Sequence, residues 1–421
     1  MSECCIIERG AIHRVVDFVR QFNATKVFLV GDRITFPLAG EAIREELEQH
    51  GIECVVYCFS IPRLEPNESA MGSLCFHYKA ECDLIIGVGS GVVDDLCKIL
   101  AHQTGNPYII VATAPSIDGY ASSSSAMVCD GMKVTIPSKC GDVIIADIDI
   151  LAKAPLDMLK AGFGDMLAKY ISLCDWRIAH LIAGETYNEE VAAQVRCALK
   201  KCVVNADGVL NRDEEAIRAV FEGLIITGQS MKKAGVSRPA SGTEHSMSHL
   251  WDMRGIEFGT PVNRHGIQCA IATYVCVQLY QKIKQIIPNR DKALQYVSAF
   301  SVEEWNSKLR EFLGNAAESM IELEKREKKY NAAAHEKRLA VILEQWDRIL
   351  TIIDEEIPVL EEFRDLILRL NMPMTLGNEP MDKKTVVMSV KAAKDIRDKY
   401  LLPRLLWDIG MLDELCDEIC L

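Results

Sequence analysis

The sequence predicts an α/β fold in which a parallel sheet covered by helices on both faces is followed by an all-helical part. Short apolar, β-branched runs alternate with helical patterns over the first 150 residues, whereas the pattern beyond residue 155 is helical almost throughout. Such alternation is typical of a parallel sheet. With 49% hydrophobic residues among 421, two large cores are expected. We therefore predict an α/β domain over 1–154 and a helical domain over 155–421.

The apolar runs give the elements of the first domain in order. β-branched residues between turn-forming residues predict strands, and an apolar face that recurs every three to four residues predicts helices. Helices are expected at 41–50 and 92–100. Strands are expected at 26–30, 54–58, 84–87, 108–113 and 143–147.

The helical domain shows the 3.6-residue period in several long segments. Two stretches depart from it: a Gly/Ser-rich turn at 237–242, and a charge-dense run at 322–338 that we interpret as an exposed helix face with ion-paired neighbours rather than a partner-binding surface. Helices are expected at 160–180, 189–201, 214–233, 265–284 and 388–400.

Composition excludes several classes of protein. The formal net charge of -13 argues against a broad nucleic-acid surface, because phosphate binding requires clustered positive charge. The sixteen cysteines are scattered, form no Cys-x-x-Cys pair and accompany no export signal, so a reduced cytoplasmic setting is expected. The longest apolar runs are far shorter than the roughly 20 residues that span a bilayer, so no transmembrane helix is expected.

A glycine-rich turn, Gly87-Val88-Gly89-Ser90-Gly91, lies between an expected strand and an expected helix. Glycines allow the backbone to approach a pyrophosphate, and the helix N-terminus offers free N–H groups. The third glycine comes earlier than in the usual G-x-G-x-x-G pattern, so a Rossmann-type nucleotide site and a simple tight turn are equally supported. Asp32, after the first strand, is interpreted either as a ligand of the ribose or adenine or as a turn residue.

The segment 113–119 follows another expected strand, and four serines at 122–125 come soon after it. Loops at strand ends of open α/β sheets commonly bind ligands, although an ordinary Ser-rich turn has the same composition. Asp118 is the residue in this loop that we expect to hold substrate hydroxyls.

Three residues with metal-binding side chains suggest one open metal site. Asp165 shares a helix face with Lys169, and its apolar neighbours predict that its carboxylate is buried and needs a partner. His245 and His249 are one helical turn apart, and His265 begins the next helix. One carboxylate and two imidazoles leave positions open for a substrate oxygen. Core histidines and a surface ion pair are the alternative interpretations.

Five motifs together resemble the sn-glycerol-1-phosphate dehydrogenase family, within the superfamily of iron-containing alcohol dehydrogenases and dehydroquinate synthase. The resemblance extends over nearly the whole chain, to the segment Arg-Asp-Lys-Tyr-Leu-Leu-Pro-Arg-Leu-Leu-Trp-Asp at 397–408. The motifs are residues 87–95, Thr-Ala-Pro-Ser-Ile-Asp-Gly-Tyr-Ala-Ser at 113–122, Gly-Phe-Gly-Asp-Met-Leu-Ala-Lys at 162–169, Arg-Pro-Ala-Ser-Gly-Thr-Glu-His-Ser-Met-Ser-His at 238–249, and Arg-His-Gly-Ile-Gln at 264–268.

The resemblance implies a dehydroquinate synthase-like enzyme with a Rossmann-like nucleotide-binding domain and a helical metal-binding domain. Asp165, His245 and His265 would bind one divalent metal, with zinc or nickel favoured over iron, while Asp118, Asp165 and His249 would contact substrate. Asp165 and His249 are the expected catalytic residues. Contacts to NAD(H) or NADP(H) are expected from Asp32, Gly89, Ser90, Gly91, Val92, Val93, Asp94, Asp95, Thr113, Ala114, Pro115, Ser116 and Ser122.

The implied reaction is reduction of dihydroxyacetone phosphate to sn-glycerol 1-phosphate by direct hydride transfer, with the metal polarising the carbonyl and His249 ending a proton relay. Lys169, Arg238 and Arg264 are the candidates for binding the substrate phosphate. A glycerol dehydrogenase that acts on unphosphorylated substrates and a catalytically silent nucleotide-binding relative are the alternatives. The family also implies a homo-oligomer.

Overall fold

The computed structural model describes residues 4–62, 64–129, 132–377 and 379–421. Contacts divide the chain into two compact units. The first comprises residues 1–166 and 200–233, and the second comprises 167–199 and 234–421. The first contains a parallel sheet and the second is almost wholly helical, so the predicted fold class is confirmed.

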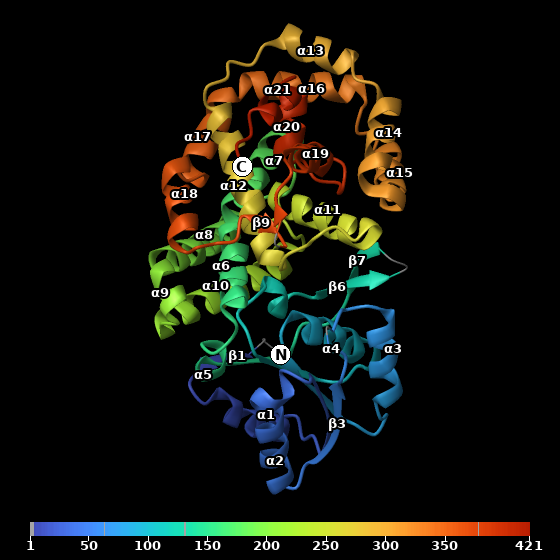
Figure 1. Cartoon of the computed structure of the whole chain (residues 1–421), viewed down its shortest axis with the longest axis vertical. Coiled ribbons are helices and arrows are strands. Elements are labelled where there is room, and N and C mark those ends of the chain that lie inside the picture. The colour runs from blue at the N-terminus through green and yellow to red at the C-terminus, as the bar shows by residue number, and fades with distance from the viewer. Residues whose placement is uncertain (1–3, 63, 130–131, 378) are drawn as a thin grey trace. The chain divides into compact units, whose positions relative to one another are not determined.

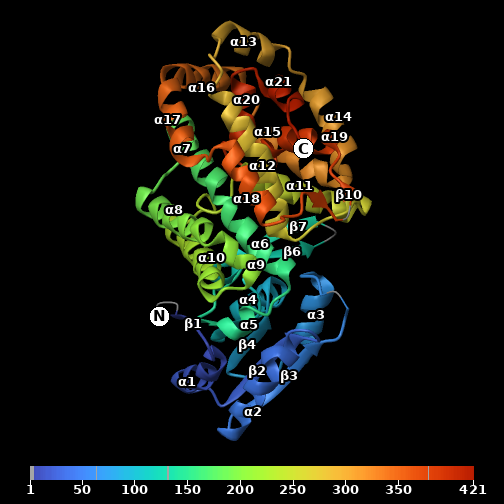
Figure 2. The same cartoon turned by 60° about the vertical axis from the view of Figure 1, so that its left-hand side comes forward.

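The first unit is built on a six-stranded parallel sheet with the strand order β1-β8-β5-β4-β2-β3. Figure 2 shows β4, β2 and β3 side by side. All five predicted strands are present, and β1 is an additional strand that pairs with β8 at the edge. The strands are β1 Cys4–Glu8, β2 Lys26–Asp32, β3 Glu53–Phe59, β4 Leu84–Gly89, β5 Tyr108–Ala112 and β8 Val143–Asp147.

Helices cover both faces of this sheet because alternate strand residues point to opposite sides. One face, which includes Val27 and Leu29, packs against α1 (Val15–Gln21) and α2 (Glu41–Gln49). The other face, which includes Gly87, meets Cys97 of α4 (Gly91–Thr104). The four central strands are therefore almost wholly buried, as their continuous apolar runs predict, whereas the edge strands β1 and β3 keep exposed residues.

The strand order reverses between β2 and β4. The chain passes from β2 outward to β3, by way of α2, and then returns through α3 (Glu68–His77) to β4 on the other side of β2. In open α/β sheets, ligands bind outside the carboxyl ends of the strands at this kind of reversal. Asp32 and Gly89 end the two strands concerned.

The serine-rich segment after residue 121 contains a strand that the sequence did not predict. Strand β6 (Ser124–Cys129) pairs antiparallel with β7 (Met132–Pro137). The Ser125 hydroxyl donates to the backbone carbonyl of Asp95 at 3.0 Å, which ties the hairpin to α4. Of the four serines interpreted as part of a ligand-binding loop or a Ser-rich turn, Ser122 and Ser123 precede the strand, whereas Ser124 and Ser125 belong to β6, where main-chain pairing outweighs the turn preference of serine.

Helix α12 (His265–Ile283) is the central helix of the second unit and is buried along nearly its full length. A helix that is apolar on all sides is expected at the centre of a bundle. Its neighbours include α7 (Lys169–Ala183) and α11 (Thr243–Phe258). Further helices of this unit (Figure 1) are α13 Arg290–Ser298, α14 Val302–Leu313, α15 Ala317–Glu327, α16 Ala332–Glu344, α17 Trp346–Glu356, α18 Leu360–Arg369, α19 Lys383–Ala393, α20 Leu402–Asp408 and α21 Leu412–Asp417.

Two predicted helices differ from the structure. The helix expected at 160–180 is divided into α6 (Leu156–Leu167) and α7, with a turn at Ala168. The helix expected at 388–400 is α19, which ends at Ala393 so that Asp395 turns inward. There its carboxylate accepts bonds from Lys394 at 3.0 Å, Trp305 at 2.8 Å and Arg404 at 2.9 Å. This buried network opposes continuation of the helix.

The charge-dense run at 322–338 is also different from its prediction. It forms the end of α15 and the start of α16, with Lys328 between them in a left-handed conformation at φ 51°. His335 is buried, and its Nε2 lies 2.8 Å from the backbone oxygen of Asp408. Arg338 is ion-paired with the buried Asp408 at 2.8 Å. Part of the run therefore faces the core, so the expectation of a single exposed face was wrong.

Helix α6 requires glycine at position 162. A Cβ atom there would lie 1.7 Å from the backbone oxygen of Pro115, in the loop after β5. We expect Gly162→Ala to reduce the free energy of unfolding by about 2 kcal/mol or more, because a backbone atom cannot move aside cheaply. Urea unfolding followed by circular dichroism measures this. Gly72→Ala in α3 is the matched control, since its Cβ meets nothing within 4 Å and should stabilise by about 0.5–1 kcal/mol. Equal effects of the two substitutions would contradict the packing described.

Candidate functional site

In the first unit, the end of β4 and the start of α4 form a close turn. Ser90 is the N-cap residue of α4, and Gly91 begins the helix. A Cβ atom on Gly89 would lie 2.5 Å from the Val93 side chain, and one on Gly91 would lie 2.4 Å from Ile117. Packing against the branched Val93 side chain therefore favours glycine at position 89, whereas the contact at position 91 is with the flexible end of Ile117. The first N–H groups of α4 remain as donors for an anion, because Ser90, Gly91 and Val92 are only half-buried.

Asp32 acts as a turn residue. Its Oδ1 accepts from the backbone N–H groups of Ile34 at 2.7 Å and Thr35 at 2.8 Å. The Thr35 hydroxyl in turn donates to the backbone oxygen of Val88 at 2.7 Å. The sequence allowed two interpretations of Asp32, a ligand of the ribose or adenine and a turn residue. The structure shows the hydrogen bonds of a turn residue. These bonds join the carboxyl ends of β2 and β4.

Asp94 and Asp95 point their side chains into the protein. The Asp94 carboxylate accepts from the Tyr108 hydroxyl at 3.0 Å and lies 3.7 Å from the Lys98 ammonium. Burial raises the pKa of Asp94 to about 7 and that of Asp95 to about 6. Lys98 also donates to the backbone oxygens of Gly119 at 2.9 Å and Ser124 at 2.7 Å. This cluster holds α4 to the loop that follows β5. Val93 is buried as well.

The loop after β5 lies against the same turn. The Thr113 N–H donates to the Gly89 carbonyl at 3.0 Å, and Thr113, Ala114, Pro115, Ser116 and Ser122 are all buried. The backbone N–H of Asp118 donates to Oδ2 of Asp165 at 3.0 Å. Asp165 is completely buried in α6, as predicted. The loop and Asp165 therefore form one connected group within the first unit.

In the second unit, three histidines lie together at the starts of two helices. His245 and His249 are on α11, and His265 is the first residue of α12. The ring centres of His245 and His265 are 4.9 Å apart, and those of His249 and His265 are 5.8 Å apart. The thiol of Cys269 joins this group: ligand atoms of His245, His265 and Cys269 all lie within 4.8 Å of one another. Sequence analysis missed Cys269, although its i+4 spacing from His265 was a signal for it.

Hydrogen bonds fix two of these rings. The Glu244 carboxylate lies 2.8 Å from Nδ1 of His245, which directs Nε2 to the opposite side, and it accepts from the Gly242 N–H at 2.8 Å. Burial raises the pKa of Glu244 to about 7. The Ser248 hydroxyl lies 3.1 Å from Nδ1 of His265. Such outer partners orient imidazoles for metal binding.

The three cationic side chains proposed for a substrate phosphate have different surroundings. The buried Lys169 ammonium donates to the Ala240 carbonyl at 3.2 Å. The guanidinium of Arg238, also buried, pairs with Glu185, with one N···O distance of 2.7 Å. Arg264 is exposed and immediately precedes His265. Of the three, Arg264 is the one placed to meet a ligand from solvent.

Two further properties concern the whole described chain. All sixteen cysteines are free thiols. Within 4–62, 64–129, 132–377 and 379–421, no helix has both the length and the apolar composition that crossing a membrane requires.

Comparison with known proteins first relates the chain to a broad class of enzymes, the iron-containing alcohol dehydrogenases. Residues 6–155 match the family model described as iron-containing alcohol dehydrogenase. Crystal structures with a similar fold include glycerol dehydrogenase from Schizosaccharomyces pombe (TM-score 0.61, 17% identity, 99% of this chain and 90% of that chain covered). Another is a probable glycerol dehydrogenase from Sinorhizobium meliloti 1021 (TM-score 0.62, 15% identity, 99% and 98% covered).

Relatives identified by sequence similarity indicate the particular family within this class. "Glycerol-1-phosphate dehydrogenase [NAD(P)+]" of Halalkalibacterium halodurans is 34% identical over 276 residues, covering 65% of this chain and 69% of the relative. The protein of the same name from Bacillus subtilis strain 168 is 34% identical over 301 residues, covering 69% and 76%. That from Methanosarcina mazei is 31% identical over 278 residues, covering 65% and 76%. The chain belongs to the glycerol-1-phosphate dehydrogenase family and is an oxidoreductase, as the motifs predicted.

Asp94→Asn should become more stable relative to the wild type as the pH rises. The pKa of Asp94 is raised from 3.8 to about 7 in the folded state, so the folded chain retains a proton that the unfolded chain has lost. Wild-type stability therefore falls as pH rises through this window, whereas an amide has no such dependence. Urea midpoints at about pH 5 and about pH 8 measure the difference. Asp365→Asn, at an exposed position on α18, is the control. A pH-independent difference for Asp94→Asn would contradict the interior placement.

Proposed function

We propose that this enzyme reduces dihydroxyacetone phosphate to sn-glycerol 1-phosphate by direct hydride transfer from NADH or NADPH, with one divalent metal. The observation that carries this proposal is the cluster of His245, His265 and Cys269, in a chain of this family. The names of the relatives support the substrate and the nicotinamide cofactor.

The proposed metal ligands are Asp165, His245 and His265. Two imidazoles whose ligand atoms lie within 4.8 Å fit a single ion, and Glu244 leaves Nε2 of His245 to bind it. Asp165 is a buried carboxylate that also accepts from the Asp118 N–H, and it is the oxygen donor that we assign to the metal. When bound, the metal supplies a Lewis acid for a ketone oxygen. Nitrogen, oxygen and nearby thiol donors suit zinc, nickel or iron.

The remaining roles follow from exposure and position. The free N–H groups at Gly91, Val92 and Val93 would bind the cofactor pyrophosphate through the backbone, because the side chains of Asp94 and Asp95 face the interior.

Arg264, exposed beside His265, would bind the substrate phosphate. His249, 5.8 Å from His265 between ring centres, would exchange a proton with the alcohol product. Asp118 would hold a substrate hydroxyl. Assembly into a homo-oligomer stays a prediction.

Removing His245 should remove the metal. We expect His245→Ala to lose bound metal and turnover together, while the affinity for NAD(H) changes by less than about twofold, because the proposed cofactor donors are in other elements. Elemental analysis of the purified protein and fluorescence titration with NADH measure the two effects. His102→Ala, at an exposed position on α4, is the matched control. Full activity after exhaustive chelation would contradict a catalytic metal. Metal loss in Cys269→Ser comparable to that in His245→Ala would add the thiol to the ligand set.

The phosphate of the substrate should matter more than the ketone alone. We expect a higher kcat/KM for dihydroxyacetone phosphate than for dihydroxyacetone. Arg264→Gln should lower it for the phosphorylated substrate by roughly 10- to 100-fold, with little effect on the other, because a charge-assisted bond contributes about 1.5–3 kcal/mol. Steady-state absorbance at the nicotinamide band measures this. Arg290→Gln, exposed at the start of α13, is the control. A preference of the wild type for dihydroxyacetone would make the enzyme a glycerol dehydrogenase instead.

A further inference from the structure

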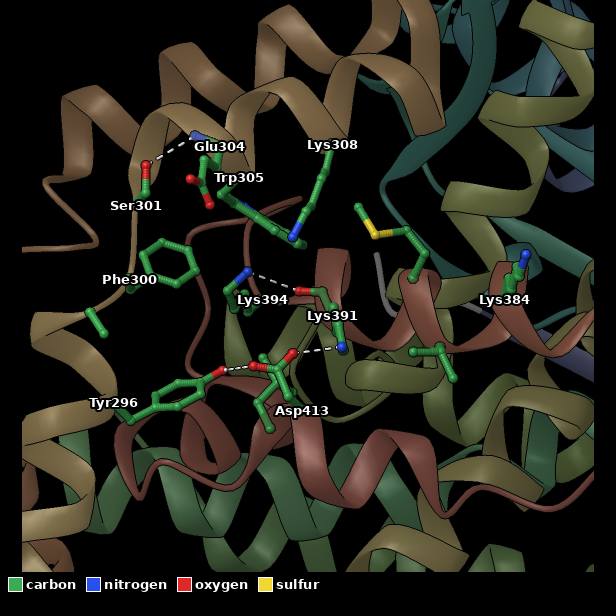
Figure 3. Close-up of a pocket in the computed structure, with 14 residues that line it drawn as sticks. Tyr296, Phe300, Ser301, Glu304, Trp305, Lys308, Lys384, Lys391, Lys394 and Asp413 are labelled. Atoms are coloured by element: carbon green, nitrogen blue, oxygen red, sulfur yellow. Dashed lines mark hydrogen bonds and ion pairs between the residues drawn. The ribbon is translucent and has the colours of Figure 1, made fainter.

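A ligand-sized cavity lies in the helical unit, and none of the residues proposed for catalysis lines it. Its volume is about 420 Å³, within the range of small-molecule sites. Figure 3 shows it between α14 and α19, with the end of α13 and the start of α21 completing its walls. None of its lining residues belongs to the five motifs that carry the family resemblance.

The two helices present regular faces to this cavity. Residues spaced i, i+3, i+4 and i+7 share one face of a helix, and both lining sets have this spacing. On α14, counted from its N-cap residue Ser301, the set is Ser301, Glu304, Trp305 and Lys308. On α19 the set is Lys384, Val387, Met388 and Lys391. The cavity is therefore a groove between two helix faces, each with a lysine at its C-terminal end.

Aromatic rings form one side of the cavity. Phe300 stacks on Tyr330, with ring centres 4.8 Å apart and planes at 27°, and meets the edge of Trp407 at 5.6 Å. These contacts hold the Phe300 ring in place, while Figure 3 shows it facing the cavity. Trp305 is fixed by its N–H bond to Asp395 at 2.8 Å. A rigid aromatic surface favours a flat ligand.

Lysines outnumber carboxylates around the cavity. Lys391 forms an ion pair with Asp413, with an N···O distance of 2.6 Å. Lys394 is buried, with its ammonium 3.4 Å from the Trp305 ring centre and 3.0 Å from Asp395. Lys308 is different: it is exposed and has no ion pair with any residue that the structure describes, and Figure 3 shows its ammonium directed from α14 into the cavity.

Lys384 is likewise exposed and without an ion pair in the described part of the chain. It lies at the other end of the α19 face from Lys391. Two of the four lining lysines, Lys391 and Lys394, are paired with Asp413 and Asp395, so Lys308 and Lys384 supply the positive charge of this region, against the carboxylate of Glu304. Such a region concentrates anions.

We propose that this cavity binds a phosphate monoester of a flat ring, with Lys308 as the phosphate ligand and the half-buried Phe300 as the surface for the ring. The aromatic side gives the ring its contact area, and in the described part of the chain no carboxylate is ion-paired with the Lys308 ammonium, although Asp413 in the same lining attracts it at longer range. Lys384 adds attraction at the rim. The inference is independent of the reaction proposed above, since it uses none of the same residues.

Calorimetric titration of the purified full-length chain with phenyl phosphate tests this proposal. Saturable binding is expected, and it should be weaker by at least about tenfold for inorganic phosphate, which lacks the ring, and for phenol, which lacks the charge. Cyclohexyl phosphate should also bind less well, because its ring is not flat.

Variants locate the site. Lys308→Gln should weaken phenyl phosphate binding by about tenfold, the loss expected for one charge-assisted contact. Lys384→Gln should have a smaller effect that disappears at high salt. Lys337→Gln, exposed on α16 and outside the cavity, and Arg264→Gln, at the proposed substrate site, should both bind as the wild type does.

Three outcomes would overturn the proposal: no heat of binding up to about 10 mM phenyl phosphate, unchanged binding by Lys308→Gln, or loss of binding in Arg264→Gln, which would place the ligand at the substrate site instead. Equal affinity for phenyl phosphate and inorganic phosphate would likewise refute a role for the rings. Lys308 is exposed, so its substitution should leave the fold intact, which an unchanged circular dichroism spectrum verifies.

Discussion

The carboxylate of Asp175 fixes the position at which α11 begins, and the histidine cluster depends on that position. It accepts hydrogen bonds from the N–H and hydroxyl of Thr243, both at 2.8 Å, from the Tyr280 hydroxyl at 2.5 Å and from the Leu402 N–H at 3.0 Å. Burial raises the pKa of Asp175 to about 6, because the interior disfavours its charged form. Four donors offset that cost, and through them α7 holds α11, α12 and the start of α20.

Sequence patterns were sufficient for elements that are apolar over their whole length. Strands β2, β4, β5 and β8 were predicted because each is a buried apolar run in the middle of the sheet, and β3 was predicted from its apolar, β-branched run although it is an edge strand. Strand β1, at the other edge, was not predicted: Ile6 and Ile7 are its only β-branched residues and it has no aromatic residue, whereas β3 adds Tyr57 and Phe59 to its two valines. The β6–β7 hairpin was not predicted because serine is a poor strand former. The pairing of β6 with β7 and the hydrogen bond from Ser125 to α4 hold this segment extended. Helix ends were missed where a buried network, such as that of Asp395, required the chain to turn.

In the candidate site, too, some features could be predicted from sequence patterns and others depend on tertiary contacts. His245, His249 and His265 could be found because helical spacing and family motifs mark them, and the structure brings their rings together. Spacing and motifs could not predict which groups surround a given side chain. Asp94 and Asp95 occupy a motif expected to contact a cofactor, yet their carboxylates face Tyr108 and Lys98. Lys98 is only one helical turn from Asp94, but Tyr108 is 14 residues from Asp94 and Leu402 is 227 residues from Asp175, so these contacts depend on the completed fold and leave no local pattern.

Helix α11 connects the histidine cluster to the cavity between α14 and α19. The Trp251 N–H donates to the Ser389 hydroxyl of α19 at 2.9 Å, and Arg254 both donates to the Phe312 carbonyl of α14 and lies over the Phe312 ring at 4.5 Å. Both walls of the cavity are thus attached to the helix that carries His245 and His249. A packed interior does not deform continuously, so α14 and α19 cannot separate without breaking one of these attachments or shifting α11. The rigidity that orients the imidazoles and the rigidity that shapes the cavity therefore have a common origin in α11.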